Sequence, residues 1–426
     1  MYTPLTPLLS ALLALAAPPP PQQTPTVRSP NDNTVVEVGG KTYHQWTDDL
    51  KSLDASVREE AIRSLAYFGH DSIRAIPLIV ERLQDSDTSP RVKAAIVLGM
   101  INIPKEDVPN VARALGVRLQ QDSQAIVRYY SAVTLNNFGE DARYALPGLV
   151  KGVTDPSTWE IRHACIAVLR SAGRDPRGGP NINVEHALVT ALHDPTYRVR
   201  LEAILAIGTL GPPNDRQLLM SVLQGLQERL TDKDPAVKIW AHVALMALDE
   251  VTEKSLQVVI RYFKNNDPKV RTEAARGLGA IGNKLKSKST MVEPALLAAL
   301  DDKDVNVVAA AAEALASLEE MSGKARSALL DLLKNPDANL RAVGARALGM
   351  AGSKGRQGVP ALTALVQDKE QPPFVLASAC WALGEIGEPS PAAVAALNDV
   401  GQRKDVDDSL KRLAQTALDQ MNKLKK

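Results

Sequence analysis

Apolar residues recur along the chain at the spacing of one face of an α-helix. In a well-formed example they stand at positions 0, +4, +8 and +11, occupied by Val270, Ala274, Leu278 and Ile281. This spacing predicts an amphipathic helix. Asp267 followed by Pro268 predicts its N-terminal cap and first turn, and Gly282 predicts a left-handed residue that ends it. A single helix of this kind cannot bury its own apolar face.

The same pattern returns every 33 to 38 residues. Position +8 is apolar in every copy and position +4 is mostly small, so that a second helix can approach closely. A period in this range predicts helical hairpins that stack on one another. The zero positions are Val57, Val92, Val127, Ile161, Val199, Val237, Val270, Val307, Leu340, Val375 and Leu410. A partner helix is predicted before all but the first, at residues 75–83, 111–119, 145–153, 184–192, 217–230, 255–263, 292–300, 325–333, 359–366 and 392–398.

The first forty residues do not follow this pattern. Residues 1–17 hold a short apolar run followed by small residues, which predicts a secretory signal peptide and hence export to a periplasmic or extracellular location. Residues 18–40 are rich in proline and polar residues and predict a disordered linker. Thr42 and Gln45 form a capping-box pair that starts the first helix, whose apolar face is predicted to hold Trp46, Leu50 and Leu53.

The composition excludes several classes of function. Fifty basic and forty-nine acidic residues give a net charge of +1, so no overall field favours nucleic acid or an anionic membrane surface. The apolar run before residue 17 is too short to span a bilayer, so no membrane span is expected in the mature chain. Cys165 and Cys380 lie six repeats apart, too far for a disulfide, and are predicted to be packed thiols.

Catalytic motifs are absent from the sequence. It contains no Gly-x-Ser-x-Gly elbow, no Cys-x-x-Cys and no His-Glu-x-x-His. Glu160 and His163 are spaced like one ligand pair of a di-iron site, but such a site needs a second pair and further carboxylates. We therefore predict no catalytic, metal-ligating or cofactor-binding residues and no cofactor.

The motif Asp-x-x-Val-Arg-x-x-Ala-x-x-x-Leu-Gly-x-Ile-Gly resembles HEAT repeats, in particular the short bacterial kind known from phycobilisome-lyase subunits. The resemblance covers residues 41–426 and implies an all-α fold, a right-handed α-solenoid of about eleven two-helix repeats. It also implies a ladder in which aspartate and arginine side chains of neighbouring repeats bond along the stack. The basic residue at +1 is replaced by Val308 and Leu376 in copies eight and ten, and it is present as Arg58, Lys93, Arg128, Arg162, Arg200, Lys238, Arg271, Arg341 and Lys411.

Positions +2 and +6 of the second helices lie opposite the core face and are expected to be polar if they are solvated. Copies two to six carry apolar residues there instead, in the pairs Ala94/Leu98, Tyr129/Val133, His163/Ala167, Leu201/Leu205 and Ile239/Val243. Either these positions form a partner-binding surface, or neighbouring repeats bury them as additional core. The candidate partner-binding residues are Tyr129, Tyr130, Trp159, His163, Leu201, Leu205, Ile239, Trp240 and His242.

These features predict an exported, non-catalytic scaffold that binds a protein or peptide on the concave face of the solenoid. The alternative is a lyase-like enzyme or chromophore-attachment factor, as in related lyases, which uses the same groove. Nucleic-acid binding is disfavoured by the near-neutral net charge.

Overall fold

The computed structural model describes residues 26–28, 35–175, 179–248 and 251–423. The predicted signal peptide, residues 1–17, lies outside the described residues, and so does most of the predicted linker. No helix among the described residues is long and apolar enough to cross a membrane.

Within the described residues, the chain forms eleven helical hairpins, each built from a first and a second helix. The predicted all-α solenoid is therefore confirmed. The first helices are α2 (Tyr43–Asp49), α4 (Ser72–Arg82), α6 (Val108–Gln121), α8 (Leu146–Gly152), α10 (Ile182–Ala191), α12 (Arg216–Arg229), α14 (Glu253–Arg261), α17 (Ser289–Ala299), α19 (Gly323–Leu332), α21 (Val359–Gln367) and α23 (Pro391–Gln402). The second helices are α3 (Ala55–Leu65), α5 (Thr88–Leu98), α7 (Ala125–Asn136), α9 (Trp159–Ala172), α11 (Tyr197–Leu210), α13 (Pro235–Leu248), α15 (Pro268–Ala280), α18 (Val305–Ser317), α20 (Ala338–Met350), α22 (Pro373–Ile386) and α24 (Asp408–Lys423).

Short helical turns connect several of these helices, either between hairpins or, for η3, within one. They are the α-helical turn α16 (Gly282–Leu285) and the 3₁₀ turns η1 (Gly69–Asp71), η2 (Gly139–Ala145), η3 (Tyr262–Lys264), η4 (Lys286–Lys288) and η5 (Gly352–Gly358).

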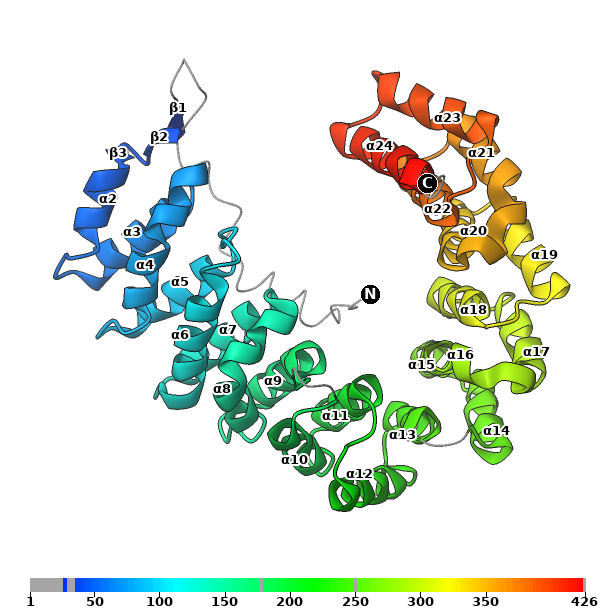
Figure 1. The fold of residues 1–426 in the computed structure, drawn as a ribbon, viewed down its shortest axis with the longest axis horizontal. Helices are drawn as coiled ribbons and strands as arrows, with labels where there is room; N and C mark the ends of the chain where they lie inside the picture. Colours follow the sequence, from blue (N-terminus) through cyan, green and yellow to red (C-terminus); the bar gives the residue numbers. More distant parts are fainter. Residues whose placement is uncertain (1–25, 29–34, 176–178, 249–250, 424–426) are drawn as a thin grey trace. The chain divides into compact units, whose positions relative to one another are not determined.

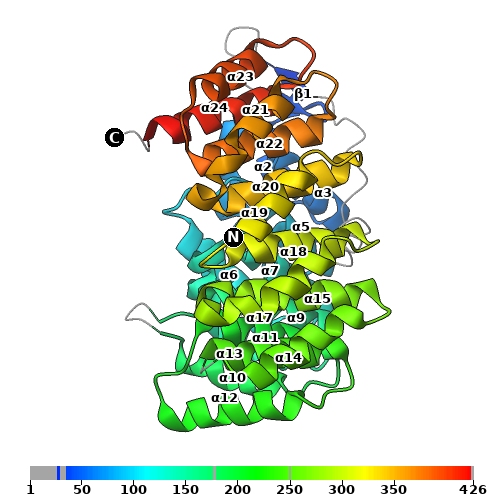
Figure 2. The ribbon, with the colours of Figure 1, turned by 90° about the vertical axis from the view of Figure 1, so that its right-hand side faces the viewer.

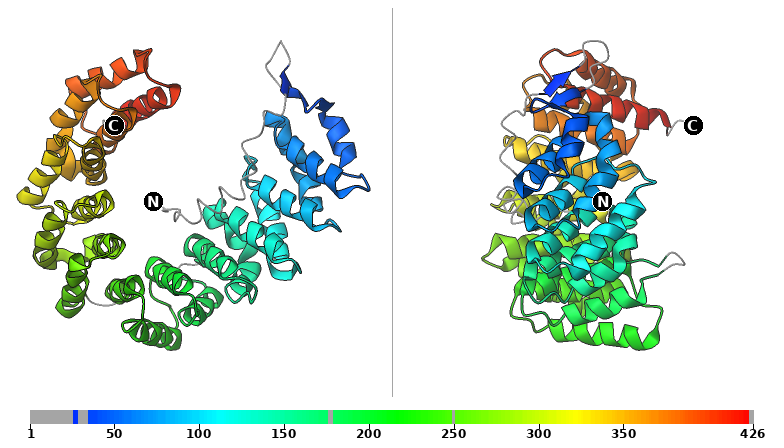
Figure 3. Two further views of the ribbon diagram at one scale, coloured as in Figure 1. Left: turned by 180° about the vertical axis from the view of Figure 1, so that it is seen from behind. Right: turned by 90° about the vertical axis from the view of Figure 1, so that its left-hand side faces the viewer.

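The chain divides into two compact units, Met1–Ala206 and Ile207–Lys426, with the boundary inside α11. In unit 1 the second helices α3, α5, α7 and α9 contact one another in chain order, and the first helices α6, α8 and α10 do the same in a separate layer (Figure 1). The blue-to-green helices of this unit are seen stacked in the right panel of Figure 3. Each repeat thus buries its apolar face against its neighbours.

Unit 2 is built in the same way. Its second helices α13, α15, α18, α20, α22 and α24 contact one another in order, and Figure 2 shows the hairpins following each other from α14 to α24. The core between the layers consists mainly of alanine, leucine and valine, including Leu278, Leu315, Leu348 and Leu383 at position +8. Small and branched side chains at these positions allow the close helix packing that the repeat pattern predicts.

The predicted helix starts are confirmed. Thr42 and Gln45 form the reciprocal capping box before α2. Asp267 caps α15 by accepting a hydrogen bond from the backbone N–H of Lys269 at 2.9 Å. Each cap uses a side-chain oxygen to satisfy a backbone donor that the helix leaves unpaired.

Two details at helix ends were predicted wrongly. Leu53 is fully exposed and lies beyond the end of α2, so it shares no face with the buried Trp46 and Leu50. Gly282 does not adopt the left-handed conformation but begins α16. A glycine is needed there for space, because a Cβ atom would lie 2.8 Å from the carbonyl oxygen of Ser317.

A small antiparallel sheet precedes the first hairpin. It is formed by β1 (Thr26–Arg28), β2 (Val35–Val38) and β3 (Lys41–Thr42), in the order β1-β2-β3. Val35 and Val38 are buried, and the indole N–H of Trp46 donates to the carbonyl oxygen of Val38 at 2.8 Å. The structure thus corrects part of the predicted 18–40 linker, because these apolar residues have a helix to pack against.

The register of copy two also differs from the prediction. The helix α5 begins after Asp87, so Pro90 rather than Val92 stands at position 0. Leu98 therefore occupies position +8 and is fully buried, whereas Met100 is 53% exposed. Ala94 and Leu98 belong to the ordinary core, and the residues at +2 and +6 of this copy are Val92 and Ile96.

Candidate functional site

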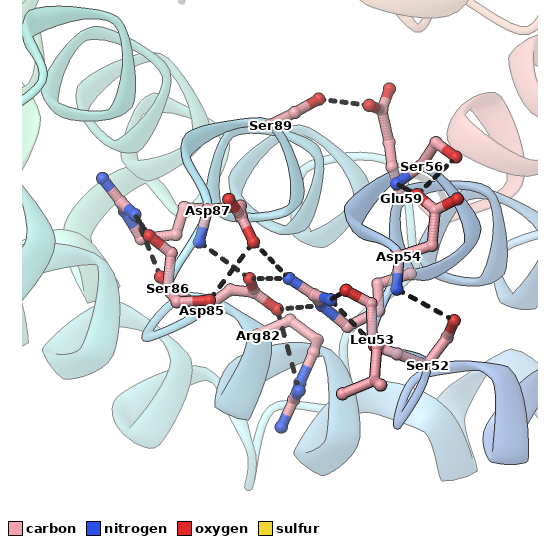
Figure 4. Close-up of polar contacts among 12 residues, drawn as sticks. Ser52, Leu53, Asp54, Ser56, Glu59, Arg82, Asp85, Ser86, Asp87 and Ser89 are labelled. Carbon is pink, nitrogen blue, oxygen red and sulfur yellow. Dashed lines mark hydrogen bonds and ion pairs between the residues drawn. The ribbon is translucent and has the colours of Figure 1, made fainter.

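A ladder of arginine and aspartate side chains links consecutive repeats, as the resemblance implied. Of the six aspartates expected as partners, two take part, Asp155 and Asp194. The other four accept backbone N–H groups at helix starts; they are Asp54, Asp234, Asp267 and Asp337. Arg58 of α3 donates from Nε and Nη2 to the carboxylate of Asp85 at 2.8 and 2.7 Å (Figure 4). Its Nη1 donates to the carbonyl oxygens of Ser52 and Leu53, and its Nη2 also donates to Asp87. The guanidinium group is therefore held on all its edges by this protein.

Further rungs repeat this geometry with buried or partly buried pairs. In copy two the arginine is Arg91 and not Lys93, which instead contacts Glu59 at 3.1 Å. The pairs that follow are Arg91–Asp122, Arg128–Asp155, Arg162–Asp194 and Arg271–Asp302, and in Arg341–Gln371 an amide replaces the carboxylate.

The ladder also sets the electrostatics of its carboxylates. Burial by itself raises the pKa of Asp85, but the hydrogen bonds from Arg58 and from the backbone N–H of Asp87, together with the charges of Arg58 and Arg82, outweigh it, so that its pKa is lowered. The hydrogen bond from Arg271 likewise lowers the pKa of Asp302. These carboxylates are held charged by their arginine partners. The ladder is thus an internal structural feature, and it accounts for Arg58, Arg128, Arg162 and Arg271 without a phosphate ligand.

A different surface lies on the second helices of unit 1. With the corrected register, positions +2 and +6 of α5, α7, α9 and α11 carry side chains that are all partly exposed. We call these residues the apolar column; they are Val92, Ile96, Tyr129, Val133, His163, Ala167, Leu201 and Leu205.

Aromatic rings border this column on α7 and α9. The rings of Tyr129 and Tyr130 meet edge to face, with centroids 5.3 Å apart. The rings of Trp159 and His163 do so at 6.1 Å. Burial, followed by the neighbouring Tyr130 and Glu160, raises the pKa of Tyr129. The tyrosine hydroxyls thus stay neutral, and the rings present apolar surface to whatever lies against them.

Charged side chains of α9 and α11 surround His163. Glu202 lies 3.3 Å from Nη1 of Arg170 and 3.7 Å from Nε2 of His163. Burial lowers the pKa of His163, and Glu202 opposes this effect. The guanidinium of Arg198 lies 5.1 Å from the centre of the Trp159 ring and 5.4 Å from that of Tyr197.

The three candidate partner-binding residues on α13 pack against or contact other helices of unit 2. Ile239 is fully buried, so the prediction that it is an exposed anchor was wrong. The indole N–H of Trp240 donates to Glu273 on α15 at 2.8 Å, and Nδ1 of His242 lies 3.2 Å from the hydroxyl of Ser255 on α14. The second-layer core explanation therefore holds for Ile239, and Trp240 and His242 contact neighbouring helices.

Position +6 is charged further along unit 2. Arg346 contacts Glu313 at 2.6 Å and Arg276 contacts Glu273 at 3.0 Å. These ion pairs are what a solvated helix face is expected to carry. The apolar column of unit 1 therefore differs from copies seven, eight and nine, in which position +6 is Arg276, Glu313 and Arg346.

Two features bear on possible chemistry in the described part of the chain, metal sites and reactive cysteines. No group of three or more histidine, cysteine, aspartate or glutamate side chains that could hold a metal ion occurs in it. Cys165 and Cys380 are free and buried, as predicted, and burial raises the pKa of the Cys380 thiol to about 12. Both thiols are therefore inert packing groups.

Some residues of this surface were not found from the sequence. Val92 and Ile96 were missed because the register of copy two was misplaced. The signal that marks them is the spacing Asp87…Arg91, which repeats the spacing Asp54…Arg58 of copy one. The contacts of Arg198 had no local signal, because they join side chains from two repeats.

The stacked hairpins and the Arg–Asp ladder define the chain as an all-α solenoid of two-helix repeats. A family model for HEAT repeats matches residues 45–128, 185–279, 258–349 and 326–419. These ranges cover well over half of the chain, and the chain belongs to the HEAT-repeat family. No curated protein matches its sequence.

Several solved structures are similar to this chain. An engineered protein is 21% identical over 89% of this chain and 98% of its own length, with a TM-score of 0.40. The karyopherin Kap121p, in a structure bound to the SUMO protease Ulp1p, is 15% identical over 89% of this chain and 45% of its own length, with a TM-score of 0.46. YIBA_ECOLI is 22% identical over 64% of this chain and 91% of its own length, with a TM-score of 0.39. The chain thus spans less than half of Kap121p, and these likenesses concern the fold alone.

Proposed function

We propose that the chain is a non-catalytic scaffold that binds a protein or peptide partner on the apolar column of unit 1. The observation that carries this proposal is the contrast between the repeats of one chain. At positions +2 and +6, α5, α7 and α11 present apolar or aromatic, partly exposed side chains, and α9 presents His163 and Ala167. In α15, α18 and α20 of unit 2, position +6 is instead Arg276, Glu313 and Arg346.

The composition strengthens this contrast. Only 4% of the residues are aromatic, yet Tyr129, Tyr130 and Trp159 lie together on α7 and α9. Exposed apolar patches on soluble proteins mark interaction sites, and tyrosine and tryptophan are the side chains that most often dominate binding energy. A surface of this kind fits an apolar protein segment.

Selection of short random peptides on the immobilised full chain tests the proposal. We expect apolar peptides whose affinity falls by about 2 kcal/mol or more when Tyr129 and Leu201 are both replaced by Ala, because hot-spot truncations cost this much. Affinity is measured by titration calorimetry, and thermal melting of each variant shows whether it remains folded.

A matched control is available on the first-helix side of unit 1. Tyr144 is also a partly exposed aromatic residue, and Ile182 of α10 is 52% exposed. Replacing both by Ala is expected to leave peptide affinity unchanged. The proposal fails if the two double variants weaken binding equally, or if the selected peptides bind the Tyr129/Leu201 variant as well as the unaltered chain.

We also propose that the protein is exported by residues 1–17. The support is the apolar run from Leu8 to Ala17 with Ala14-Leu15-Ala16 near its end, which has the Ala-x-Ala pattern of a cleavage site. The mature chain is then expected to begin near Pro18. N-terminal sequencing of protein purified from its native cells checks this, and recovery of the chain with Met1 intact contradicts it.

A further inference from the structure

Arg198 differs from the ladder arginines in what surrounds its guanidinium group. Its Cζ lies 5.1 Å from the ring centre of Trp159 and 5.4 Å from that of Tyr197. Among the described residues no carboxylate pairs with it, whereas Arg128 and Arg162 on the preceding second helices are both bound to aspartate. A guanidinium held by its face against aromatic rings keeps its N–H edges available for an anion.

The neighbouring carboxylates are engaged elsewhere. Glu202 lies against Arg170 and His163. Glu160, on α9, contributes to raising the pKa of both Tyr129 and His163, so its charge lies near these two side chains. Glu160 lies on α9, and Glu202 lies on α11 together with Arg198. Neither carboxylate forms an ion pair with Arg198 among the described residues. Arg198 is thus a cation at the edge of the apolar column to which the described part of the chain supplies no paired carboxylate.

The size of the column limits the shape of its partner. It runs across α5, α7, α9 and α11, and packed helices lie about 8–10 Å apart, so its length is roughly 25–30 Å. An extended strand advances about 3.3 Å per residue, so a peptide of about eight residues spans this distance. Arg198 lies on α11, the helix at one end of the column.

We propose that the partner segment is an extended apolar peptide carrying an aspartate or glutamate, and that Arg198 binds this carboxylate. This inference rests on the proposed function, because it names the class of partner for the same surface. The apolar side chains of the peptide pack against the apolar column, including Val92, Tyr129 and Leu201. The carboxylate of the peptide accepts hydrogen bonds from the N–H groups of Arg198. Arginine and carboxylate form strong, directional pairs of this kind.

Random peptides selected on the full chain provide the probe. Two synthetic versions of a selected peptide are compared, one with its acidic residue and one with Gln or Asn in its place. We expect Asp and Glu to be enriched among the selected peptides. Replacement Arg198→Gln is expected to weaken binding of the acidic version on the order of tenfold, which is the usual effect of losing one hydrogen bond to a charged group. It should leave the neutral version unaffected.

Arg113→Gln is the matched control. Arg113 of α6 also lies over an aromatic ring, with its Cζ 5.0 Å from the centre of the Tyr144 ring, but it belongs to the first-helix layer. This variant is expected to bind both peptide versions as the unaltered chain does. Thermal melting of the two arginine variants shows whether each remains folded.

Three results overturn the inference in distinguishable ways. If apolar peptides are selected without acidic residues, or if Arg198→Gln binds both versions unchanged, the acidic partner is wrong and the scaffold function stands. If Arg113→Gln weakens the acidic version as much as Arg198→Gln, the effect is one of overall charge and Arg198 has no special role. If no selected peptide depends on Tyr129 and Leu201, the proposed function itself fails.

Discussion

Replacing Asp85 by Ala is expected to lower the free energy of unfolding by about 1–3 kcal/mol, the usual cost of leaving buried donors without an acceptor. The side chains of Asp85 and Arg58 are 2% and 7% exposed. Without Asp85, two N–H groups of Arg58 lose their acceptor, while Asp87, labelled in Figure 4, still pairs with the guanidinium at 2.7 Å. Urea unfolding of the variant and the unaltered chain measures the loss.

The ladder supplies its own control. Lys238 occupies in α13 the position that Arg58 occupies in α3, and none of the described residues forms an ion pair with it. Lys238→Ala is expected to change stability by no more than about 0.5 kcal/mol. The double variant Arg58→Met with Asp85→Leu should recover part of the loss, because no uncompensated charge then stays buried. A loss below about 1 kcal/mol for Asp85→Ala contradicts the buried pair.

Replacing Ile239 by Ala is expected to cost about 2–5 kcal/mol of stability, as large-to-small changes in a packed core do. Ile239 is fully buried against α15, where its Cγ2 lies 3.4 Å from the position that a Cβ on Gly277 would take. The surrounding helices cannot fully close the space that the deleted atoms leave. Urea unfolding measures the change.

Leu201 gives the comparison for this prediction. It occupies the same helical position as Ile239, but it is partly exposed. Leu201→Ala is therefore expected to destabilise the chain clearly less than Ile239→Ala, because its surface is already partly hydrated. Equal losses for the two variants would show that Leu201 is core as well, which would remove it from the proposed binding surface.

Local sequence signals were enough for the hairpins and their stacking order. Each signal acts within one helix: apolar residues at helical spacing, an oxygen-bearing cap such as Thr42 or Asp267, and small residues at position +4. The ladder was also predicted, through the family resemblance, but in copy two the predicted residue Lys93 was wrong and Arg91 forms the pair. This error in register arose because Pro90 stands where the other copies carry a branched aliphatic residue.

The sequence did not determine which apolar residues at positions +2 and +6 are covered. Ile239 and Tyr129 stand at the same helical position, and only the next helix decides their exposure. The second helix that follows Ile239 is α15, whose position +7 is Gly277 and allows close approach. The second helix that follows Tyr129 is α9, whose position +7 is Val168, a branched side chain that takes up space. Likewise, Trp159 and Tyr197 meet Arg198 only when α9 and α11 are packed together. The sequence alone determined the repeats, because their signals are local. The surface was decided only by the tertiary structure, because it depends on contacts between residues far apart in the chain.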